Sequence, residues 1–383
     1  MTAATTAALT LLALASLVAG VPPEGVSTRY VVVGGHRRAY ELQLPRAFTD
    51  AGHRVPLILS FHGDNGTAAE QADDDQLRSV VGALAIVVHG IGIGRELHTG
   101  WLHPTWNGGG SSMQAIGPLP RGISPDGPTC QPNISKPYAS CFASCAGEFA
   151  ARDHCDPCWW SHCLDDVAYV IAILDQLEAQ YAVDNSSIFA TGCSNGGMFL
   201  YTLIADPRIA HRIAAVAPVA GLPHNGFLFP PLNRRLRFLT IWGRADDYVV
   251  AQCNVPGRPD KSFSHRYGWY YSCLPNTTRF IATSLGIDPH QGPRPLHASA
   301  PESQGAGRAA TAVIVEPPCH GWTRDNNLTQ LTAAVVADCS WNGPHGWPGT
   351  RDADYEDGER GRGGTGRRWA TRTIASFFLR TAL

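Results

Sequence analysis

Residues 187–204 constrain the fold of this chain more than any other segment. They read SIFATG, a short strand with β-branched residues, followed at once by Gly-Cys-Ser-Asn-Gly and by a helical stretch through Ile204. In a sheet covered by helices, such a turn joins the end of a strand to the start of a helix and lifts its central serine, Ser194, above the carboxyl edge of the sheet. Gly192 and Gly196 suit this turn because they let neighbouring backbone pass close by.

Strands and helices alternate along the rest of the chain. Residues 29–33 and 39–44 flank GGHRR and are typical of an antiparallel hairpin. Apolar side chains recur at helical spacing after Asp165 and Asp166, either of which can cap that helix, and again in the final segment 368–379. The apolar runs typical of buried strands are 55–61, 83–89, 214–221, 237–243 and 331–338. The sequence therefore predicts an α/β-hydrolase fold, with a mostly parallel central sheet, helices on both faces and an antiparallel edge.

The length of 383 residues allows one large domain or two smaller ones, and no internal repeat divides the chain. We interpret residues 25–383 as a single α/β-hydrolase domain. Residues from about 100 to 163 are rich in Gly, Pro, Cys and Trp and follow neither the helical nor the strand period. So long a stretch without regular structure is typical of a functional or cross-linked insertion. We expect a cysteine-rich insertion here, which could fold over the site as a lid.

The charge balance argues against two classes of partner. The net charge is −2, so the chain carries no excess of positive charge of the kind that attracts nucleic acid or an anionic membrane. After the first twenty residues, no stretch approaches the roughly 18 uninterrupted apolar residues that a membrane-spanning helix needs. We therefore expect neither nucleic acid nor membrane as a partner, and the sequence leaves the oligomeric state open.

Three features together predict secretion. Residues 1–20 are small, apolar and uncharged, as in a signal peptide, although no Lys or Arg precedes Arg29. Eleven cysteines, six of them between Cys130 and Cys163, favour an oxidising compartment. Five Asn-x-Ser/Thr sequons are compatible with glycosylation on that route; they begin at Asn65, Asn133, Asn185, Asn276 and Asn327. We expect an extracellular, disulfide-bonded protein with at least one cysteine outside any internal pair.

A nucleophilic serine requires a base, and in this fold the chain order is serine, acid, histidine. The acid is expected just after the strand 237–243, where Asp246 and Asp247 follow; we favour Asp246. The histidine is expected after the last strand, which leads into CSWNGPHGWPG and so to His345. His320 is the rival, but it precedes that strand, so we favour His345.

An oxyanion hole needs two backbone N–H donors near the serine. The first is predicted to be the N–H of Asn195, which begins the helix after the nucleophile. The second is expected in the loop that ends ILSFHGDNG, from Gly63 or Asp64. His62 in the same loop is interpreted as an orienting side chain that packs inside the loop, not as the base.

Four short segments together resemble one family. FHGDNG, GCSNGGMF, GRADDYV and HGWPG look like LHG, G-x-SNGGM, HG-x-AD-x-x-V and H-x-WPG at the matching places of a secreted esterase family. That family contains polyhydroxybutyrate depolymerases, feruloyl esterases and acetyl xylan esterases. The resemblance extends from about residue 29 to the C-terminal helix, and SNGGM with H-x-WPG is much more specific than Gly-x-Ser-x-Gly alone.

The resemblance implies a role for each matching residue. Ser194 would be the nucleophile, Asp246 would orient the imidazole, and His345 would act as general base and acid, with no cofactor. The substrate would be an ester, with a feruloyl or related plant cell-wall polysaccharide ester as first choice and a polyhydroxybutyrate or acetyl xylan ester as alternatives. A catalytically silent binding protein with the same fold is the hypothesis outside this class. The sequence departs from the family at the insertion, and at Asp247 and Val250, where many relatives have prolines. These departures affect the expected substrate more than they affect the expected triad.

The segment CDPCWWSHC admits two interpretations. Cys155, Cys158 and Cys163, with His154 or His162, could bind zinc. In a secreted chain this pattern favours disulfides, so no metal site is predicted.

Two disulfide hypotheses concern cysteines outside the insertion. By resemblance to the family, Cys273 and Cys319 are a candidate pair that brackets the segment before the last strand. Cys193, next to the nucleophile, is either a small buried packing residue or half of a disulfide with Cys339 as candidate partner. Connectivity does not follow from sequence alone, so both alternatives for Cys193 stay open.

One aromatic side chain is a candidate for substrate contact. Trp347 lies two residues after His345, where an indole ring suits stacking on a sugar or a phenolic ring. The sequon at Asn65 falls in the predicted oxyanion loop, and a glycan there would crowd the site. We therefore expect that this sequon carries no glycan.

Overall fold

The computed structural model describes residues 25–45, 54–95, 102–108, 123–124, 127–128, 130–131, 162, 164–291, 294–295, 319–323, 334–348 and 369–379. Several predictions fall outside these residues. They are the signal peptide 1–20, most of the cysteine-rich insertion, the sequons at Asn133 and Asn327, and the zinc or disulfide alternatives for His154, Cys155, Cys158 and Cys163.

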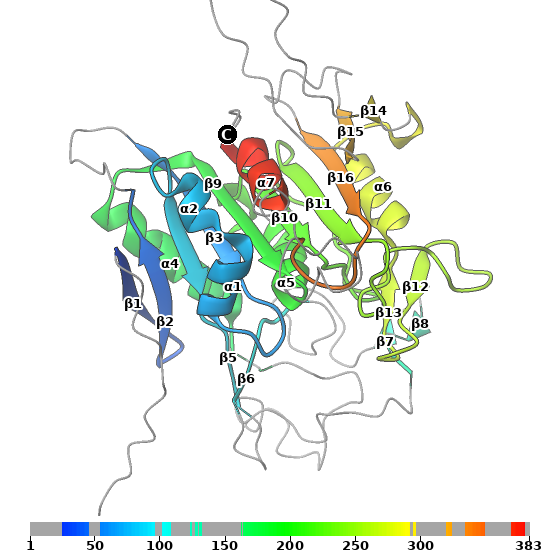
Figure 1. The fold of residues 1–383 in the computed structure, drawn as a ribbon, viewed down its shortest axis with the longest axis horizontal. Helices are drawn as coiled ribbons and strands as arrows, with labels where there is room; N and C mark the ends of the chain where they lie inside the picture. Colours follow the sequence, from blue (N-terminus) through cyan, green and yellow to red (C-terminus); the bar gives the residue numbers. More distant parts are fainter. Residues whose placement is uncertain are drawn as a thin grey trace, which may run out of the picture.

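A ten-stranded sheet organises the described residues, in the order β1-β2-β4-β3-β9-β10-β11-β16-β15-β14 (Figure 1). From β4 to β16 all neighbours are parallel, whereas β1, β2, β15 and β14 add antiparallel strands at the two edges. The bounds of the sheet strands are β1 Val26–Val33, β2 His36–Gln43, β3 Val55–Phe61, β4 Ile86–Gly90, β9 Val183–Cys193, β10 Ala215–Val219, β11 Arg237–Gly243, β14 Arg294–Pro295, β15 Cys319–Thr323 and β16 Val335–Trp341. The predicted α/β-hydrolase fold is confirmed.

Helices cover both faces of this sheet (Figure 1). Side chains alternate along each strand, so in β3 Leu57 and Leu59 join one apolar cluster whereas Ile58 joins the other. The first cluster packs against α4, α5 and α6, and the second against α2 and α7. The helices are α1 Ala68–Asp75, α2 Leu77–Val81, α4 Asp166–Gln180, α5 Asn195–Ala205, α6 Leu274–Ser284 and α7 Trp369–Leu379, with short 3-10 turns η2 Ala210–Arg212 and η3 Pro289–Gln291. None of these described helices is long and apolar enough to cross a bilayer.

Local sequence explains where the helices begin. Thr67 caps α1 through a capping box, in which its hydroxyl accepts from the Glu70 N–H and the Glu70 carboxylate accepts from the Thr67 N–H. Asp165, one of the two capping residues that the sequence allows, caps α4 by accepting from the Ala168 N–H at 2.9 Å. These side chains satisfy N–H groups that a helix start otherwise leaves without partners.

Three two-stranded ribbons lie outside the main sheet. They are β5 Ile93–Arg95 with β6 Leu102–Thr105, β7 Ile123–Ser124 with β8 Gly127–Pro128, and β12 Lys261–Phe263 with β13 Tyr270–Ser272. None of these three ribbons was predicted from the sequence, and neither was β14 or β15. β15 reads CHGWT, which shows no alternation of apolar and polar residues, so only its pairing with β16 identifies it as a strand.

A buried ion pair anchors the start of α4. Arg38 of β2 and Asp166 approach to 2.6 Å, with both side chains almost fully excluded from solvent. The same carboxylate accepts from the Asn107 backbone N–H at 2.7 Å and lies 3.2 Å from the His162 ring. Burial raises the pKa of Asp166, but His162 and Arg38 lower it more, to about 2. The pair therefore joins the N-terminal hairpin to α4 and to residues from both ends of the predicted insertion.

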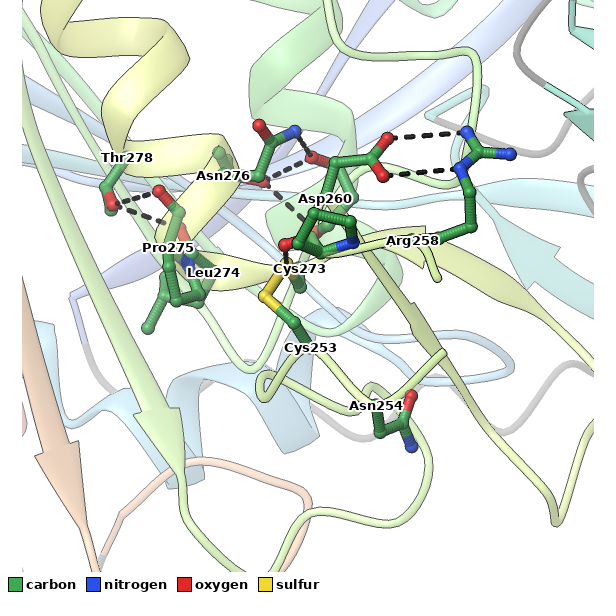
Figure 2. Close-up of a disulfide and its surroundings, with 12 residues drawn as sticks. Cys253, Asn254, Arg258, Asp260, Cys273, Leu274, Pro275, Asn276 and Thr278 are labelled. Carbon is green, nitrogen blue, oxygen red and sulfur yellow. Dashed lines mark hydrogen bonds and ion pairs between the residues drawn. A yellow bond between two sulfur atoms is a disulfide. The ribbon is translucent and has the colours of Figure 1, made fainter. Parts of the chain in front are cut away.

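The disulfide pairing differs from the sequence-based hypotheses. Cys273 bonds to Cys253, as Figure 2 shows, and Cys319 bonds to Cys339. The predicted Cys273–Cys319 pair is therefore wrong, and Cys339 is not the partner of Cys193. The physical reason is register, because Cys319 and Cys339 lie directly opposite each other on β15 and β16.

Candidate active site

Ser194 lies at a strained turn between β9 and α5. Its φ is 51° and its ψ is −117°, a conformation that residues with a side chain rarely adopt. The two glycines of the frame are required by space: a Cβ on Gly196 would overlap the carbonyl oxygen of Phe61, and one on Gly192 would lie 2.7 Å from the Gly196 carbonyl carbon. The strand–turn–helix context that the motif needs is present.

Ser194, His345 and Asp246 form one hydrogen-bonded series. The Ser194 Oγ lies 2.8 Å from His345 Nε2, and His345 Nδ1 lies 2.8 Å from Asp246 Oδ2. The Asp246 side chain is almost fully buried, whereas that of His345 retains 16% of its exposure. Because a carboxylate only accepts, Nδ1 carries the proton and Nε2 is left to accept from the serine hydroxyl.

Backbone contacts fix the two loops that supply His345 and Asp246. The loop after β11 and the loop after β16 are joined by hydrogen bonds from Arg244 N–H to the Trp341 carbonyl and from Ala245 N–H to the Gly343 carbonyl. A Cβ on Gly243 would overlap that Gly343 carbonyl, so this close approach requires glycine.

The second oxygen of the Asp246 carboxylate is also held. It accepts from the backbone N–H groups of Tyr248 at 2.9 Å and of Val249 at 2.8 Å. Because one oxygen contacts the imidazole and the other the turn, the carboxylate is fixed in both position and rotation.

The predicted oxyanion loop lies beside the serine. A Cβ built on Gly63 would be 3.4 Å from the Ser194 Cβ, and the loop is pinned by the Asn65 N–H, which donates to the Pro104 carbonyl at 2.8 Å. Asp64 belongs to the same turn. Asn195 is the first residue of α5, and within the described part of the chain its backbone N–H has no hydrogen-bond acceptor.

His62 is held as a neutral side chain. The Gly92 N–H donates to its Nε2 at 2.9 Å, so the proton lies on Nδ1, which contacts the Gly63 carbonyl at 2.7 Å. Burial lowers the pKa of this imidazole. Both ring nitrogens are therefore engaged, Nδ1 by the loop itself and Nε2 by the segment after β4, which is the arrangement expected of an orienting side chain.

Other candidates lie away from this series. The His320 ring pairs with Asp338 at 3.7 Å on β16. Trp347 was predicted to contact substrate, but it is 1% exposed and its indole N–H donates to Thr371 in α7, so its ring faces the core. Although Trp347 is close to His345 in sequence, it packs into the apolar cluster that includes α2 and α7. Cys193 is a free, buried thiol, which decides its two alternatives in favour of packing.

Two contributors to the site were missed from the sequence. The Asn195 side chain accepts from the Trp106 N–H at 2.7 Å and donates to the Trp106 carbonyl at 3.0 Å, so it ties the segment after β6 to the nucleophile turn. Tyr248 stacks on the His345 ring, with centroids 5.0 Å apart and planes 14° apart. The only sequence signal for Tyr248 was its position two residues after Asp246. For Asn195 the sequence predicted only the backbone.

No group of three or more His, Cys, Asp or Glu side chains within the described ranges is arranged to hold a metal ion. The contacts among Ser194, His345 and Asp246 have the geometry that activation of a serine nucleophile requires, in which one side chain can accept the serine proton and a carboxylate orients that side chain.

Comparison with known proteins finds esterases, although no family model matches the chain. The chain is similar to a bifunctional acetylxylan esterase/xylanase from Neocallimastix patriciarum, at 34% identity over 87 residues, which cover 23% of this chain and 12% of that protein. Among solved structures it is similar to an acetyl xylan esterase from Aspergillus awamori, with a TM-score of 0.43 and 11% identity, covering 83% of this chain and 94% of that chain. It is also similar to a thermostable esterase, with a TM-score of 0.34 and 15% identity, covering 59% of this chain and 48% of that chain. The chain thus spans 12% of the curated relative and about half of the thermostable esterase.

Proposed function

We propose that this protein is a serine carboxylic ester hydrolase that works through an acyl-enzyme. The observation that carries the proposal is the series Ser194–His345–Asp246, with 2.8 Å at each of its two contacts. A serine hydroxyl is a poor nucleophile until a base takes its proton, and His345 Nε2 is within reach to do so. Similarity to an acetylxylan esterase/xylanase over 87 residues adds support from sequence.

The reaction would proceed in two halves. His345 takes the Ser194 proton while Oγ attacks the ester carbonyl, and the oxyanion accepts from the N–H of Asn195 and from an N–H of Gly63 or Asp64. The tetrahedral intermediate collapses, and the imidazolium returns the proton to the departing alcohol oxygen. Water then attacks the acyl-enzyme by the same route and releases the acid and free Ser194. Asp246 stabilises the imidazolium in both halves.

The first test is Ser194→Ala, assayed with 4-nitrophenyl acetate. Loss of a triad nucleophile is expected to lower kcat at least about 10⁴-fold. Ser186→Ala is the matched control, because Ser186 lies near the other end of β9 and its hydroxyl donates to the neighbouring Asp184 carboxylate. Activity of Ser194→Ala within about tenfold of the parent would contradict the proposal.

A second measurement separates the enzyme from a silent binding protein with the same fold. A fluorophosphonate probe should label Ser194 in the parent, and mass spectrometry of the labelled peptide identifies the residue. Labelling should be lost in His345→Ala, because the hydroxyl then lacks its base. Absence of labelling in the folded parent would favour the silent binding protein.

For the natural substrate, we propose a feruloyl or related ester of a plant cell-wall polysaccharide. An acetylated xylan and a hydroxybutyrate polyester are the alternatives. The named activity of the Neocallimastix relative includes acetylxylan esterase, which favours a polysaccharide ester over a polyester. Rates on acetylated xylan, feruloylated arabinoxylan and hydroxybutyrate oligomers decide between them, and the preferred class is the one with the highest kcat/KM.

We also propose that the chain is secreted. Two disulfides lie within the described residues, and Cys130 is disulfide-bonded as well. Disulfides of this kind persist mainly in oxidising compartments. N-terminal sequencing of protein from the culture medium should show that about twenty residues have been removed.

A further inference from the structure

An aromatic ring stands against the imidazole of His345. Tyr248 and His345 are stacked, with ring centroids 5.0 Å apart and planes 14° apart. Tyr248 belongs to the turn that carries Asp246, and its backbone N–H donates to the Asp246 carboxylate at 2.9 Å. One turn therefore supplies both the carboxylate at Nδ1 and the ring along the face of the imidazole.

A second segment holds Tyr248 from outside. We call residues 264–269, between β12 and β13, the hairpin tip. The Arg266 guanidinium lies over the Tyr248 ring at 4.5 Å from its centroid, and the Tyr267 ring lies 4.7 Å away, centroid to centroid. Arg266 also reaches the Asp247 carboxylate at 3.1 Å.

The backbone of the turn is tied to the same hairpin tip. The buried Ser264 hydroxyl donates to the Asp247 carbonyl at 2.8 Å. Beyond the two segments, the Cys253–Cys273 disulfide joins the chain after the turn to the start of α6 (Figure 2). The turn that carries Asp246 and Tyr248 is therefore held at its side chains, at its backbone and through a cross-link.

The ion pair between Arg266 and Asp247 contributes little to holding the turn. The Arg266 and Asp247 side chains are 53% and 56% exposed, and exposed pairs of this kind contribute little to stability. The contact that matters is the face of Tyr248 against the imidazole. The hydrogen bond with Tyr267, followed by burial, raises the pKa of the Tyr248 phenol, so the ring is neutral near neutral pH.

We infer that Tyr248 is a positioning residue for His345, and that the hairpin tip holds Tyr248 in place. The inference rests on the proposed function. Both hydrogen bonds of the imidazole require its plane to stay within roughly 10–20° of one orientation, and a stacked ring resists tilting out of that plane. The electron-rich face of the tyrosine also favours the imidazolium that forms during each half of the reaction.

Within the described residues, three side chains contact the His345 imidazole. Asp246 contacts Nδ1, Ser194 contacts Nε2, and the neutral Tyr248 covers the ring. Arg266 lies beyond Tyr248 and is paired with Asp247, so its positive charge is partly balanced. Removal of the tyrosine ring should therefore remove an interaction that favours the protonated form of the imidazole.

The test compares Tyr248→Leu with Tyr248→Phe on 4-nitrophenyl acetate. The leucine variant should lose about tenfold in kcat with little change in KM, because the loss falls on the orientation of the base. The acid limb of its kcat/KM profile should move down by about half a pH unit. The phenylalanine variant keeps the ring, so kcat should stay within about twofold of the parent and the acid limb should not move.

Tyr30→Leu is the matched control. Tyr30 also lies beneath an arginine, with Arg37 at 3.6 Å from its ring centroid, but it is exposed and lies on β1 at the far edge of the sheet (Figure 1). This variant should leave kcat and the pH profile unchanged.

One outcome separates this inference from the proposed function. If Ser194→Ala is inactive while Tyr248→Leu matches the parent in kcat and pH profile, the positioning role is overturned and the esterase proposal stands. If Tyr248→Leu fails to fold, the double variant Arg266→Gln/Tyr267→Leu decides, because both side chains are exposed. A two- to threefold fall in kcat at constant KM supports the role of the hairpin tip, and an unchanged kcat rejects it.

Discussion

At the scale of single residues, the turn of Ser194 depends on glycines, because a Cβ at these positions would overlap the neighbouring backbone. A Cβ on Gly196 would overlap the Phe61 carbonyl, whereas a Cβ on Gly63 would meet only ordinary contacts of 3.4 Å and beyond. Gly196→Ala should therefore lower the free energy of unfolding by about 3 kcal/mol. Gly63→Ala should change it by less than about 1 kcal/mol, and urea unfolding measures both. Equal stabilities for the two variants would show that the turn relaxes freely.

Cys193 offers a second prediction at this scale. Burial raises the pKa of its thiol well above the ordinary value, so almost no thiolate forms near neutral pH. Iodoacetamide at pH 8 should leave Cys193 unmodified in the folded protein and alkylate it after unfolding in urea, as peptide mass spectrometry can show. Rapid alkylation of the native protein would mean that the turn opens.

Residue types and their order along the chain were enough to select Ser194, Asp246 and His345, which the structure brings within hydrogen-bond distance. They were not enough for Trp347. Two residues of separation from His345 do not determine on which side of a tight loop a side chain emerges, and this one enters the core. Contacts between distant segments, such as Tyr248 with the hairpin tip, leave no local pattern to find.

At the scale of elements, the two disulfides form a matched pair for experiment. Each spans 20 residues, so a chain-entropy argument gives about 3 kcal/mol for either cross-link. Cys319→Ala/Cys339→Ala should lose that stability and keep kcat, because β16 remains paired with β11 along seven residue pairs. Cys253→Ala/Cys273→Ala should lose similar stability and also lower kcat a few-fold, because this cross-link supports the turn of Asp246. Thermal unfolding and ester hydrolysis measure the two effects, and an equal kcat in both variants would contradict the distinction.

Periodicity predicted the buried strands well, since 55–61 and 237–243 match β3 and β11 at both ends. It failed at β15, whose residues show no alternation, and it could not give the disulfides. Pairing of cysteines depends on which strand residues stand opposite one another, and register is a property of the assembled sheet. The family-based pair of Cys273 and Cys319 was wrong for this reason.

At the scale of the whole molecule, acid stability should depend on the buried carboxylate of Asp166. Its pKa falls from 3.8 to about 2 in the folded state. A lowered pKa stabilises the folded state above the unfolded value, and this stability is lost as pH falls from about 4 towards 2. The lost contribution is about 2 kcal/mol, because each pKa unit corresponds to about 1.4 kcal/mol. Urea unfolding between pH 5 and pH 2.5 measures this slope.

Asp166→Asn isolates that contribution from those of other carboxylates. The variant should be less stable at pH 7 by about 3 kcal/mol or more, because Arg38 is left buried without its partner. Its stability should also fall less steeply than that of the parent below pH 4. Parallel slopes in the two proteins would mean that the Asp166 carboxylate is not the group that titrates.

The anchoring around Asp166 has a consequence for how such a chain can vary over time. Asn107, near the start of the predicted insertion, donates its backbone N–H to Asp166. Its side-chain amide donates to the Leu164 carbonyl, just after the insertion. The chain therefore departs from and returns to one spot, and Asn195 ties that spot to the nucleophile turn through Trp106. The segment between these ends has a further attachment at the hairpin tip, where the Gln131 N–H donates to the Gly268 carbonyl at 2.8 Å. A change in the number of residues between these attachment points leaves the anchoring contacts themselves in place, so the length of the chain can vary there while the turn of Ser194 keeps its support.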